Sequence, residues 1–265
     1  MDGHNGSKIN RLLKIWPRGT IAVYPWLRKH GIYRQLADRY QKTAWFQRIG
    51  RGAFTRLNDK VDWTGGLYAI QEQLKRPIHA GGKTALQIQG YAHFLPLGKQ
   101  DIVTLFGNHG ARLPAWFQEH DWEKWIRYKM TNLFPSDSDL GITKRGISAY
   151  SIQLSTPERA IMEVLYLVPQ EESFEEARLL MEGLTTLRPR LVQTLLEVCN
   201  SVKVKRLFLF LAEASNHSWV NKLDLSKVNL GKGKRVVVQG GHLDSKYQII
   251  VPKVGHAHKD SGEPA

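Results

Sequence analysis

Residues 24–54 read YPWLRKHGIYRQLADRYQKTAWFQRIGRGAF, and their pattern decides the fold of the first part of the chain. Pro25 fits the first turn of a helix, where its missing N–H costs little, and Gly31 ends that helix. A further helix is predicted over residues 33–42. Two strand-like runs around a Gly-Arg-Gly turn then predict a hairpin over residues 45–57. The residues of the second helical pattern that face the core are Ile32, Leu36 and Tyr40, four apart.

Another helix precedes this stretch, because four apolar residues fall on one helical face before Pro17-Arg18-Gly19 breaks the pattern. Helix, helix, short turn, helix and hairpin form the order of a winged helix-turn-helix, with the turn at His30-Gly31-Ile32. In such a module the third helix enters the major groove, and the hairpin lies over phosphate or the minor groove. The four apolar residues are Ile9, Leu12, Leu13 and Trp16.

Positive charge is concentrated in the same region. The chain has 265 residues and a net charge of +14, and its first 57 residues hold twelve Lys and Arg against two Asp. This asymmetry indicates a nucleic-acid partner, with a membrane surface as the weaker option. The sequence has no apolar run long enough to span a bilayer and no signal peptide, so the expected compartment is the cytoplasm.

The predicted contacts to double-stranded DNA lie on the third helix and the hairpin. Arg and Gln on the helix can read base edges, whereas the hairpin arginines are expected to position the protein on phosphates. Two alternatives stay open, namely a helical subdomain with a solvated basic face and a winged helix that binds protein or RNA. The predicted residues are Tyr33, Arg34, Gln35, Asp38, Arg39, Lys42, Arg48, Arg51 and Arg56.

The stretch PIHAGGKT, residues 77–84, ends like a phosphate-binding loop. Such a loop needs a glycine where Pro77 stands, and proline has no N–H and a fixed φ. The stretch is therefore predicted to be a strand followed by a helix, with Thr84 as the helix N-cap. Lys83 is left an open role as an exposed contact at that helix N-terminus.

The remainder of the chain predicts a larger mixed α+β domain. Residues 1–57 form the winged helix, residues 58–66 a polar connector and residues 67–255 the larger domain. Residues 256–265 are expected to be a disordered tail. The fold class is therefore α+β, with an N-terminal winged helix-turn-helix. Strands are expected over residues 78–79, 101–106, 147–154, 234–241 and 246–252, with helices between them.

A second basic zone spans residues 201–235, with eight Lys and Arg against Glu213 and Asp224. It is either a solvated face or a supplementary surface for nucleic acid or a partner. The residues predicted for such a surface are Lys203, Lys205, Arg206, Lys232, Lys234 and Arg235.

The sequence predicts no catalytic residue, no metal site and no cofactor. It contains neither a Gly-x-Ser-x-Gly nor a His-Glu-x-x-His motif, and its ten histidines are scattered. Asp137 and Asp139 resemble the start of a calcium loop, but the glycine is misplaced and no Glu follows at the twelfth position. The single cysteine, Cys199, is predicted to be a buried small apolar residue.

Four stretches together resemble the AbiEi family, the antitoxins of type IV toxin–antitoxin and phage abortive-infection systems. They are residues 24–54 quoted above, GLYAIQEQL (66–74), HAGGKTALQIQGYAHFLPLG (79–98) and LPAWF (113–117). The resemblance is clearest over about residues 8–120 and looser to about residue 250.

This resemblance implies a DNA-binding antitoxin that is not an enzyme. Its winged helix would bind inverted repeats in its own promoter, and its larger domain would counteract a nucleotidyltransferase toxin, directly or indirectly. The DNA-reading positions carry over to residues 33–42 and to the hairpin around Arg51. Two alternatives remain: a winged-helix regulator with a ligand-sensing domain around Trp116, Trp122 and Trp125, and a metal-dependent nucleic-acid-processing enzyme using Asp137 and Asp139.

Overall fold

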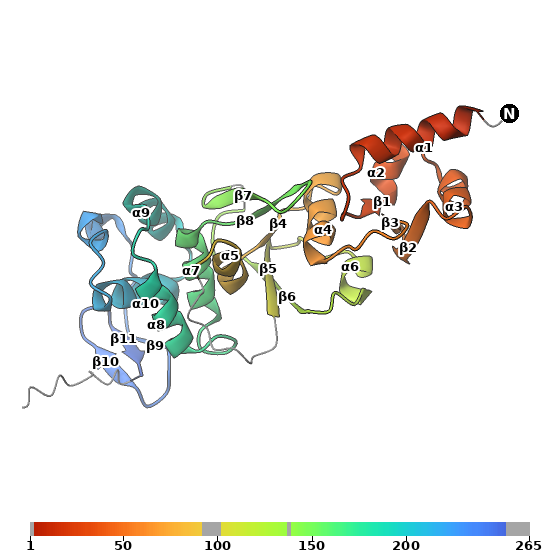
Figure 1. The fold of residues 1–265 in the computed structure, drawn as a ribbon. Coiled ribbons are helices and arrows are strands. Elements are labelled where there is room, and N and C mark those ends of the chain that lie inside the picture. Colours follow the sequence, from red (N-terminus) through yellow and green to blue (C-terminus); the bar gives the residue numbers. More distant parts are fainter. Residues whose placement is uncertain (1–2, 92–101, 137–138, 253–265) are drawn as a thin grey trace, which may run out of the picture.

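The structure, a computed structural model, describes residues 3–91, 102–136 and 139–252, with the side chains of residues 3–7 excepted. The molecule is elongated (Figure 1), with the N-terminal elements at one end, a β-sheet in the middle and a group of helices beyond it. The expected tail, residues 256–265, lies outside the described residues, as does Asp137.

The N-terminal end is a winged helix with the predicted order of elements. It contains α1 (Gly3–Ile15), β1 (Ala22–Val23), α2 (Tyr24–Lys29), α3 (Arg34–Lys42), β2 (Phe46–Gly50) and β3 (Ala53–Arg56). The three strands form an antiparallel sheet in the order β1-β3-β2. Its core gathers the residues that the helical spacing placed inward, including Ile9, Leu12, Trp16, Ile32 and Tyr40.

A five-stranded sheet forms the centre of the molecule, in the order β6-β5-β4-β8-β7. The strands are β4 (Ile78–Ala80), β5 (Ile102–Asn108), β6 (Trp125–Thr131), β7 (Ile142–Gly146) and β8 (Ser151–Ser155). β4 lies between β5 and β8, antiparallel to the first and parallel to the second. Helix α4 (Trp63–Tyr68) and the π-helix η1 (Ala69–Gln73) precede β4, α5 (Gly82–Ile88) follows it, and α6 (Ala115–Glu119) precedes β6.

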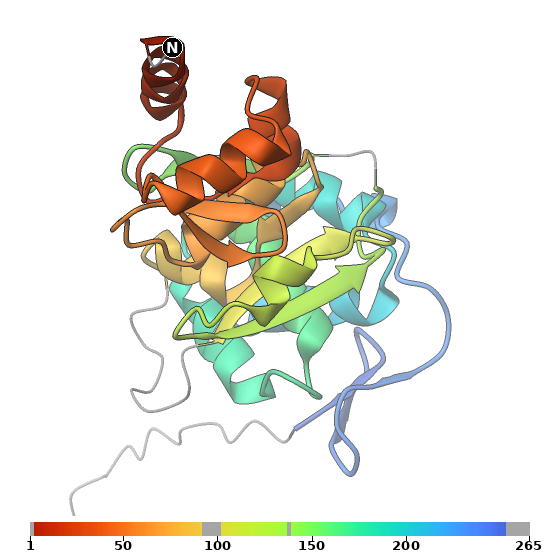
Figure 2. The same cartoon turned by 90° about the vertical axis from the view of Figure 1, so that its right-hand side faces the viewer.

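Four helices pack beyond the sheet, namely α7 (Pro157–Leu167), α8 (Phe174–Gly183), α9 (Pro189–Val198) and α10 (Val202–Ala214). Helix α7 is buried along almost its whole length because α5, α8, α9 and α10 surround it. Two 3₁₀ turns, η2 (Val220–Lys222) and η3 (Leu225–Lys227), follow α10. They lead to a small sheet of β9 (Arg235–Val236), β10 (His242–Asp244) and β11 (Ile249–Val251). Figure 2 looks along the molecule from the winged-helix end, with the helices behind.

The apolar core is shared along the chain. Ile21, Val23 and Ala53 of the winged helix belong to the same buried cluster as Leu67 and Ile70 of α4 and η1. The winged helix therefore rests on the larger domain through apolar contacts. The N-terminal half of the expected connector, residues 58–62, is irregular, whereas Trp63 to Gly66 form the buried start of α4.

Several details differ from the sequence prediction, among them the strand expected over residues 234–241, of which only Arg235–Val236 forms β9. The strand expected over residues 147–154 is shorter, because β8 begins at Ser151 and residues 147–150 form the turn from β7. Thr84 is not the N-cap of α5, because Gly81 holds that position. The Thr84 hydroxyl instead accepts a hydrogen bond from Thr104 N at 2.8 Å and joins α5 to β5.

Candidate nucleic-acid interface

Helix α3 has one face on the core and the other in solvent. Ala37 and Tyr40 are buried, and the predicted reading residues occupy the opposite face. Spacings of three and four residues place them on neighbouring turns, so that they form one continuous surface. The predicted residues on and before α3 are all exposed, namely Tyr33, Arg34, Gln35, Asp38, Arg39 and Lys42.

The start of α3 is fixed by the preceding helix. The Tyr24 hydroxyl accepts a hydrogen bond from Arg34 N at 3.1 Å and so satisfies an amide that no helical carbonyl can reach. The turn between α2 and α3 requires Gly31, whose φ of +77° is in the left-handed region that favours glycine. Sequence and backbone geometry therefore both favour a helix-turn-helix at this place.

The hairpin of the winged helix turns toward the larger domain. Gly50 approaches α6 so closely that a Cβ there would lie 2.7 Å from the Cβ of Trp116, and Tyr24 N donates to Gly52 O at 2.8 Å. Arg48 and Arg51 are exposed on this hairpin, and Arg48 Nε donates to Gly50 O at 3.1 Å. The arginines at the turn are thus held beside the start of α2 and α6.

Arg56 does not fit its predicted role as a phosphate contact. Its Nη2 donates to Leu13 O at 2.6 Å, and its guanidinium lies over the ring of Trp16, 5.6 Å from the centroid. Burial lowers the pKa of the Arg56 guanidinium below its usual value. Arg56 therefore ties β3 to α1 inside the winged helix.

The second basic zone divides into buried and exposed cations. Arg206 is 3% exposed and donates to the carbonyl oxygens of Leu230, Gly231, Gly233 and Gln248. Lys205 is 5% exposed. Both were wrongly predicted as surface residues, because they lie on buried positions of α10, where Arg206 packs against the segment that leads to the small sheet.

Lys203 also makes contacts inside the protein. Its Nζ donates to Tyr166 O at 2.9 Å and to Val168 O at 2.5 Å, and burial lowers the pKa of its ammonium. Of the six residues predicted for a supplementary surface, Lys232, Lys234 and Arg235 are exposed, on and beside the loop before β9.

Lys83 forms an internal ion pair, so the prediction of an exposed contact is wrong. Its Nζ reaches Glu172, and lies 3.3 Å from Glu176 at the start of α8. Glu172 also accepts a hydrogen bond from Arg127 Nη1 of β6 at 2.6 Å. The Gly-Lys-Thr stretch is thus one side of a structural ion-pair network between α5, β6 and α8.

The described residues contain a buried polar cluster that superficially resembles a catalytic triad. Glu163 is 1% exposed and accepts hydrogen bonds from Ser155 Oγ at 2.8 Å, Arg159 Nε at 3.0 Å and Gly82 N at 3.0 Å. His79 Nε2 lies 2.9 Å from Oε1 of Glu163, the oxygen that Arg159 also contacts, whereas Ser155 and Gly82 donate to Oε2. In a catalytic triad the histidine lies beside the serine hydroxyl, but here Ser155 donates to the carboxylate instead and is fully buried. The cluster therefore joins β4, β8, α5 and α7 without an accessible nucleophile.

The electrostatics of this cluster favour an ionised carboxylate. Burial alone would raise the pKa of Glu163, but the charges and hydrogen bonds of His79, Arg159 and Ser155 outweigh it and lower the pKa to about 2. Cys199 is buried as predicted, and burial raises the pKa of its thiol. Within the described ranges, no group of three or more His, Cys, Asp or Glu could hold a metal ion.

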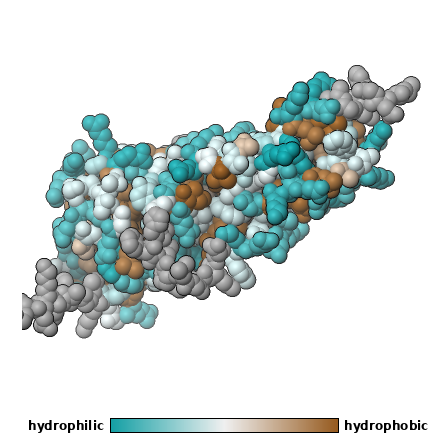
Figure 3. Space-filling model, in the orientation of Figure 1, coloured by the Kyte–Doolittle hydropathy of each residue, from teal (hydrophilic) through white to brown (hydrophobic). Residues whose placement is uncertain are grey.

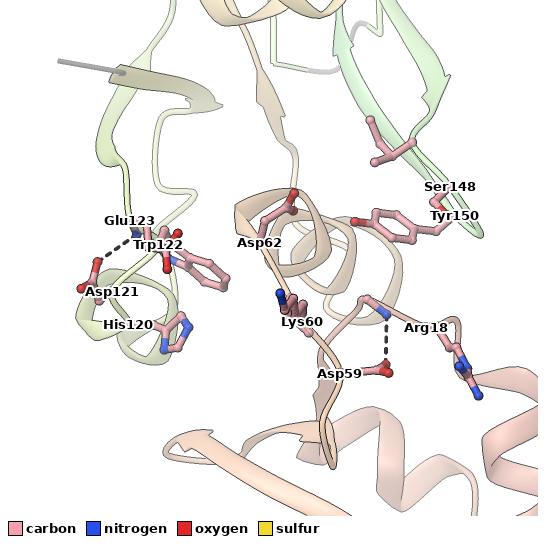
Figure 4. A pocket seen from close by; sticks show the side chains of 13 residues that line it. Arg18, Asp59, Lys60, Asp62, His120, Asp121, Trp122, Glu123, Ser148 and Tyr150 are labelled. Atoms are coloured by element: carbon pink, nitrogen blue, oxygen red, sulfur yellow. Dashed lines mark hydrogen bonds between the residues drawn. The ribbon is translucent and has the colours of Figure 1, made fainter.

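A cleft of about 770 Å³ lies where the winged helix meets the larger domain. Tyr150 and Trp122 face it from opposite sides, with Lys60 and Asp62 of the connector between them (Figure 4). Much of its wall is already hydrogen-bonded: Asp59 accepts from Gly19 N at 3.1 Å, and the Thr64 and Tyr150 hydroxyls lie 2.7 Å apart.

The three tryptophans that suggested a ligand pocket do not enclose one together: Trp122 and Trp125 line an open hollow, and Trp116 is not among its lining residues. Trp116 and Trp122 are buried, whereas Trp125, at the start of the edge strand β6, is 65% exposed. Among the concave features of the described residues, the cleft at the junction is the one that lies between the winged helix and the larger domain. On the face shown in Figure 3, apolar surface gathers at the winged-helix end among hydrophilic surroundings.

The fold is that of a winged-helix protein with a mixed α+β domain. Residues 5–97 match the family model "Transcriptional regulator, AbiEi antitoxin N-terminal domain", and residues 100–252 match "Transcriptional regulator, AbiEi antitoxin, Type IV TA system". The chain belongs to the AbiEi antitoxin family of type IV toxin–antitoxin systems, as the sequence resemblance implied.

A solved structure has the same overall fold. The crystal structure of the RV2827C protein from Mycobacterium tuberculosis matches with a TM-score of 0.59 at 11% identity, over 93% of this chain and 91% of that one. At this identity the likeness concerns the fold alone. No curated protein matches the sequence significantly. In the part of the chain that the structure describes, no helix is both long and apolar enough to cross a membrane.

Proposed function

We propose that the protein is a DNA-binding antitoxin that represses its own operon. Helix α3 reads inverted repeats of double-stranded DNA in the promoter, and the larger domain counteracts a nucleotidyltransferase toxin encoded beside it. The protein is not itself an enzyme and acts in the cytoplasm. The observation that carries the proposal is the exposed polar and basic face of α3 on a winged helix with most of the net charge.

The individual roles follow from position. Arg34, Gln35 and Arg39 have the side chains that form paired hydrogen bonds with base edges. Arg48 and Arg51 position the hairpin on phosphates, which confers affinity without sequence preference. A second exposed surface that suits an anionic partner lies at the far end of the molecule and consists of Lys232, Lys234 and Arg235.

The decisive experiment is titration of promoter DNA with the wild type and with Arg34→Ala, Arg39→Ala and the double variant. Each substitution is expected to weaken specific binding by about 1–3 kcal/mol where the arginine reads a base. Arg190→Ala removes the same charge at an exposed position of α9 and is the matched control. Unchanged operator affinity in the double variant would exclude α3 as the reading helix.

Toxin counteraction requires its own test. Expression of the adjacent nucleotidyltransferase gene is expected to arrest growth, and co-expression of this protein is expected to restore it. Restoration by the Arg34/Arg39 double variant would separate neutralisation from DNA binding. Failure of the wild type to restore growth would contradict the antitoxin role.

The junction cleft favours a second candidate, a winged-helix regulator whose DNA affinity responds to a small ligand. The neighbouring gene distinguishes the two, because a co-transcribed nucleotidyltransferase fits the antitoxin and an isolated gene fits the sensor.

A further inference from the structure

Gln73 completes the edge of a winged-helix strand, although it belongs to the larger domain. It lies in η1 and is 7% exposed. Its Oε1 accepts a hydrogen bond from Val23 N at 2.9 Å, and its Nε2 donates to Ile21 O at 2.7 Å. β3 covers the other edge of β1, where Ala22 pairs with Phe54. The carboxamide of Gln73 therefore takes the place of a neighbouring strand.

Gln71 makes the corresponding contacts on the central sheet. Its Nε2 donates to Ile78 O at 2.8 Å and to Gln153 O at 3.0 Å, and its Oε1 accepts from Gln153 N at 2.8 Å. Ile78 belongs to β4 and Gln153 to β8. The side chain thus bridges the two strands beyond their single backbone pairing at Ala80 and Leu154.

The helix that carries both glutamines is suited to join two bodies. Residues two apart point to roughly opposite sides of a helix, so Gln71 faces the central sheet while Gln73 faces the winged helix. The wider turn is a π-helix, closed by Leu74 N donating to Ala69 O at 3.0 Å. Such turns are rare and often occur at functional positions. Ile70, directly before Gln71, is fully buried in the shared core.

We infer that Gln73 is a positioning residue for DNA binding, which fixes the orientation of the winged helix, and so of α3, relative to the central sheet. The expected effect of Gln73 on DNA binding rests on the proposed function. Its role in orienting the winged helix does not. Gln73 touches no residue of the DNA-reading face. Its loss frees β1 on one edge and leaves α1, α2 and α3 packed around their own core.

The inference is tested by measuring a distance across the junction in the free protein. Spin labels are attached at Gln41→Cys on α3 and Arg190→Cys on α9, both exposed, with the buried Cys199 changed to Ala. The parent protein is expected to give one narrow distance distribution. Gln73→Met, which keeps the length but removes both hydrogen bonds, is expected to broaden or shift it. Gln87→Met on the exposed side of α5 is the control and is expected to leave it unchanged.

A DNA arm separates positioning from damage to the winged helix. Gln73→Met is expected to bind a short duplex that covers only the winged-helix footprint as the wild type does, and to lose about tenfold on full promoter DNA. Equal losses on both duplexes, or an unchanged narrow distance distribution, would overturn the inference. If Gln73→Met does not fold, Gln73→Glu, which keeps the acceptor for Val23 N and loses the donor to Ile21 O, is measured in its place with the same expected result. Absence of promoter binding by the wild type would refute the proposed function, while the distance measurement would still decide the role of Gln73.

Discussion

At the scale of single residues, the arginines of the winged helix differ in what their guanidinium groups touch. Arg51 is exposed on the hairpin, whereas Arg56 is held by Leu13 O and the ring of Trp16. Residue type and spacing along a strand gave both the same predicted role. The distinction depends on α1 crossing the end of β3, which is a tertiary contact that the local pattern does not contain.

Arg56→Ala is therefore expected to affect stability before DNA binding. Loss of a charged hydrogen bond and of the contact with Trp16 is expected to lower the free energy of unfolding by about 1–3 kcal/mol. Arg51→Ala is expected to leave stability unchanged and to reduce the salt dependence of DNA binding by about one phosphate contact. Urea denaturation and salt-dependent titration of the two variants measure these effects, and the reverse assignment would contradict the structure.

The buried Glu163 cluster predicts a specific pH dependence of stability. Because the folded-state pKa of Glu163 is lowered to about 2, below the roughly 4.3 of an unfolded glutamate, the ionised form stabilises the fold above the unfolded pKa. This contribution, on the order of 3 kcal/mol, is lost as the pH falls from about 4.3 through about 2. The expected difference in unfolding free energy between the wild type and Glu163→Gln is thus largest near neutral pH. It should shrink across this window in acid denaturation, and a difference independent of pH would contradict the proposed ionised state.

Single residues also show why a lysine or arginine in a basic stretch of sequence need not lie on the surface. Lys205 and Arg206 were counted as surface cations, yet Arg206 is satisfied by four backbone carbonyl groups from a segment far along the chain. Arginine has five donors in a planar fork, so a cage of carbonyls can bury it without a carboxylate. Nothing in the residues around Arg206 encodes that cage.

At the scale of elements, the winged helix was predictable because its signals are local. Helical spacing, Pro25 and Gly31 place α2 and α3 close to their observed bounds, and the break at Pro17 places the end of α1, which begins earlier than its apolar pattern. β7 was missed because it is a polar edge strand, with Lys144 and Arg145 exposed and pairing on β8 alone. Local spacing does not distinguish the π-helix η1 from an ordinary helix, because its two glutamines contact two different sheets.

A substitution in the turn between α2 and α3 is expected to lower the stability of the protein. Gly31→Ala places a Cβ in free space, but the residue must keep a φ of +77°. We expect a loss of about 1 kcal/mol in unfolding free energy from the backbone alone. Gly146→Ala, in β7 with no atom near the added Cβ, is the matched control and should change stability by less than about 0.5 kcal/mol. Equal effects of the two substitutions in chemical denaturation would show that the turn is not held in this conformation.

At the scale of the whole molecule, the boundary between the two regions matched by the family models does not coincide with a boundary between two separate parts of the fold. The N-terminal family region, residues 5–97, contains β4 and α5, and the second region, residues 100–252, contains β5 and β8. β4 is hydrogen-bonded to both of those strands, and α5 packs on α7. Each region therefore holds part of one sheet and one core.

This arrangement predicts that the chain unfolds as a unit. The shared cluster extends from Ile21 and Val23 of the winged helix through Ile70 to Leu154 of β8, so loss of either side exposes apolar residues of the other. A single calorimetric transition, with coincident signals from the winged-helix and C-terminal tryptophans, is the expected result. Fragments 1–98 and 99–265 are each expected to lack cooperative unfolding alone and to regain it when co-expressed, because β4 and α5 then return to the sheet. Independent transitions, or a separately folded 99–265 fragment, would show that the sheet forms without its central strand, which the pairing of β4 with β5 and β8 argues against.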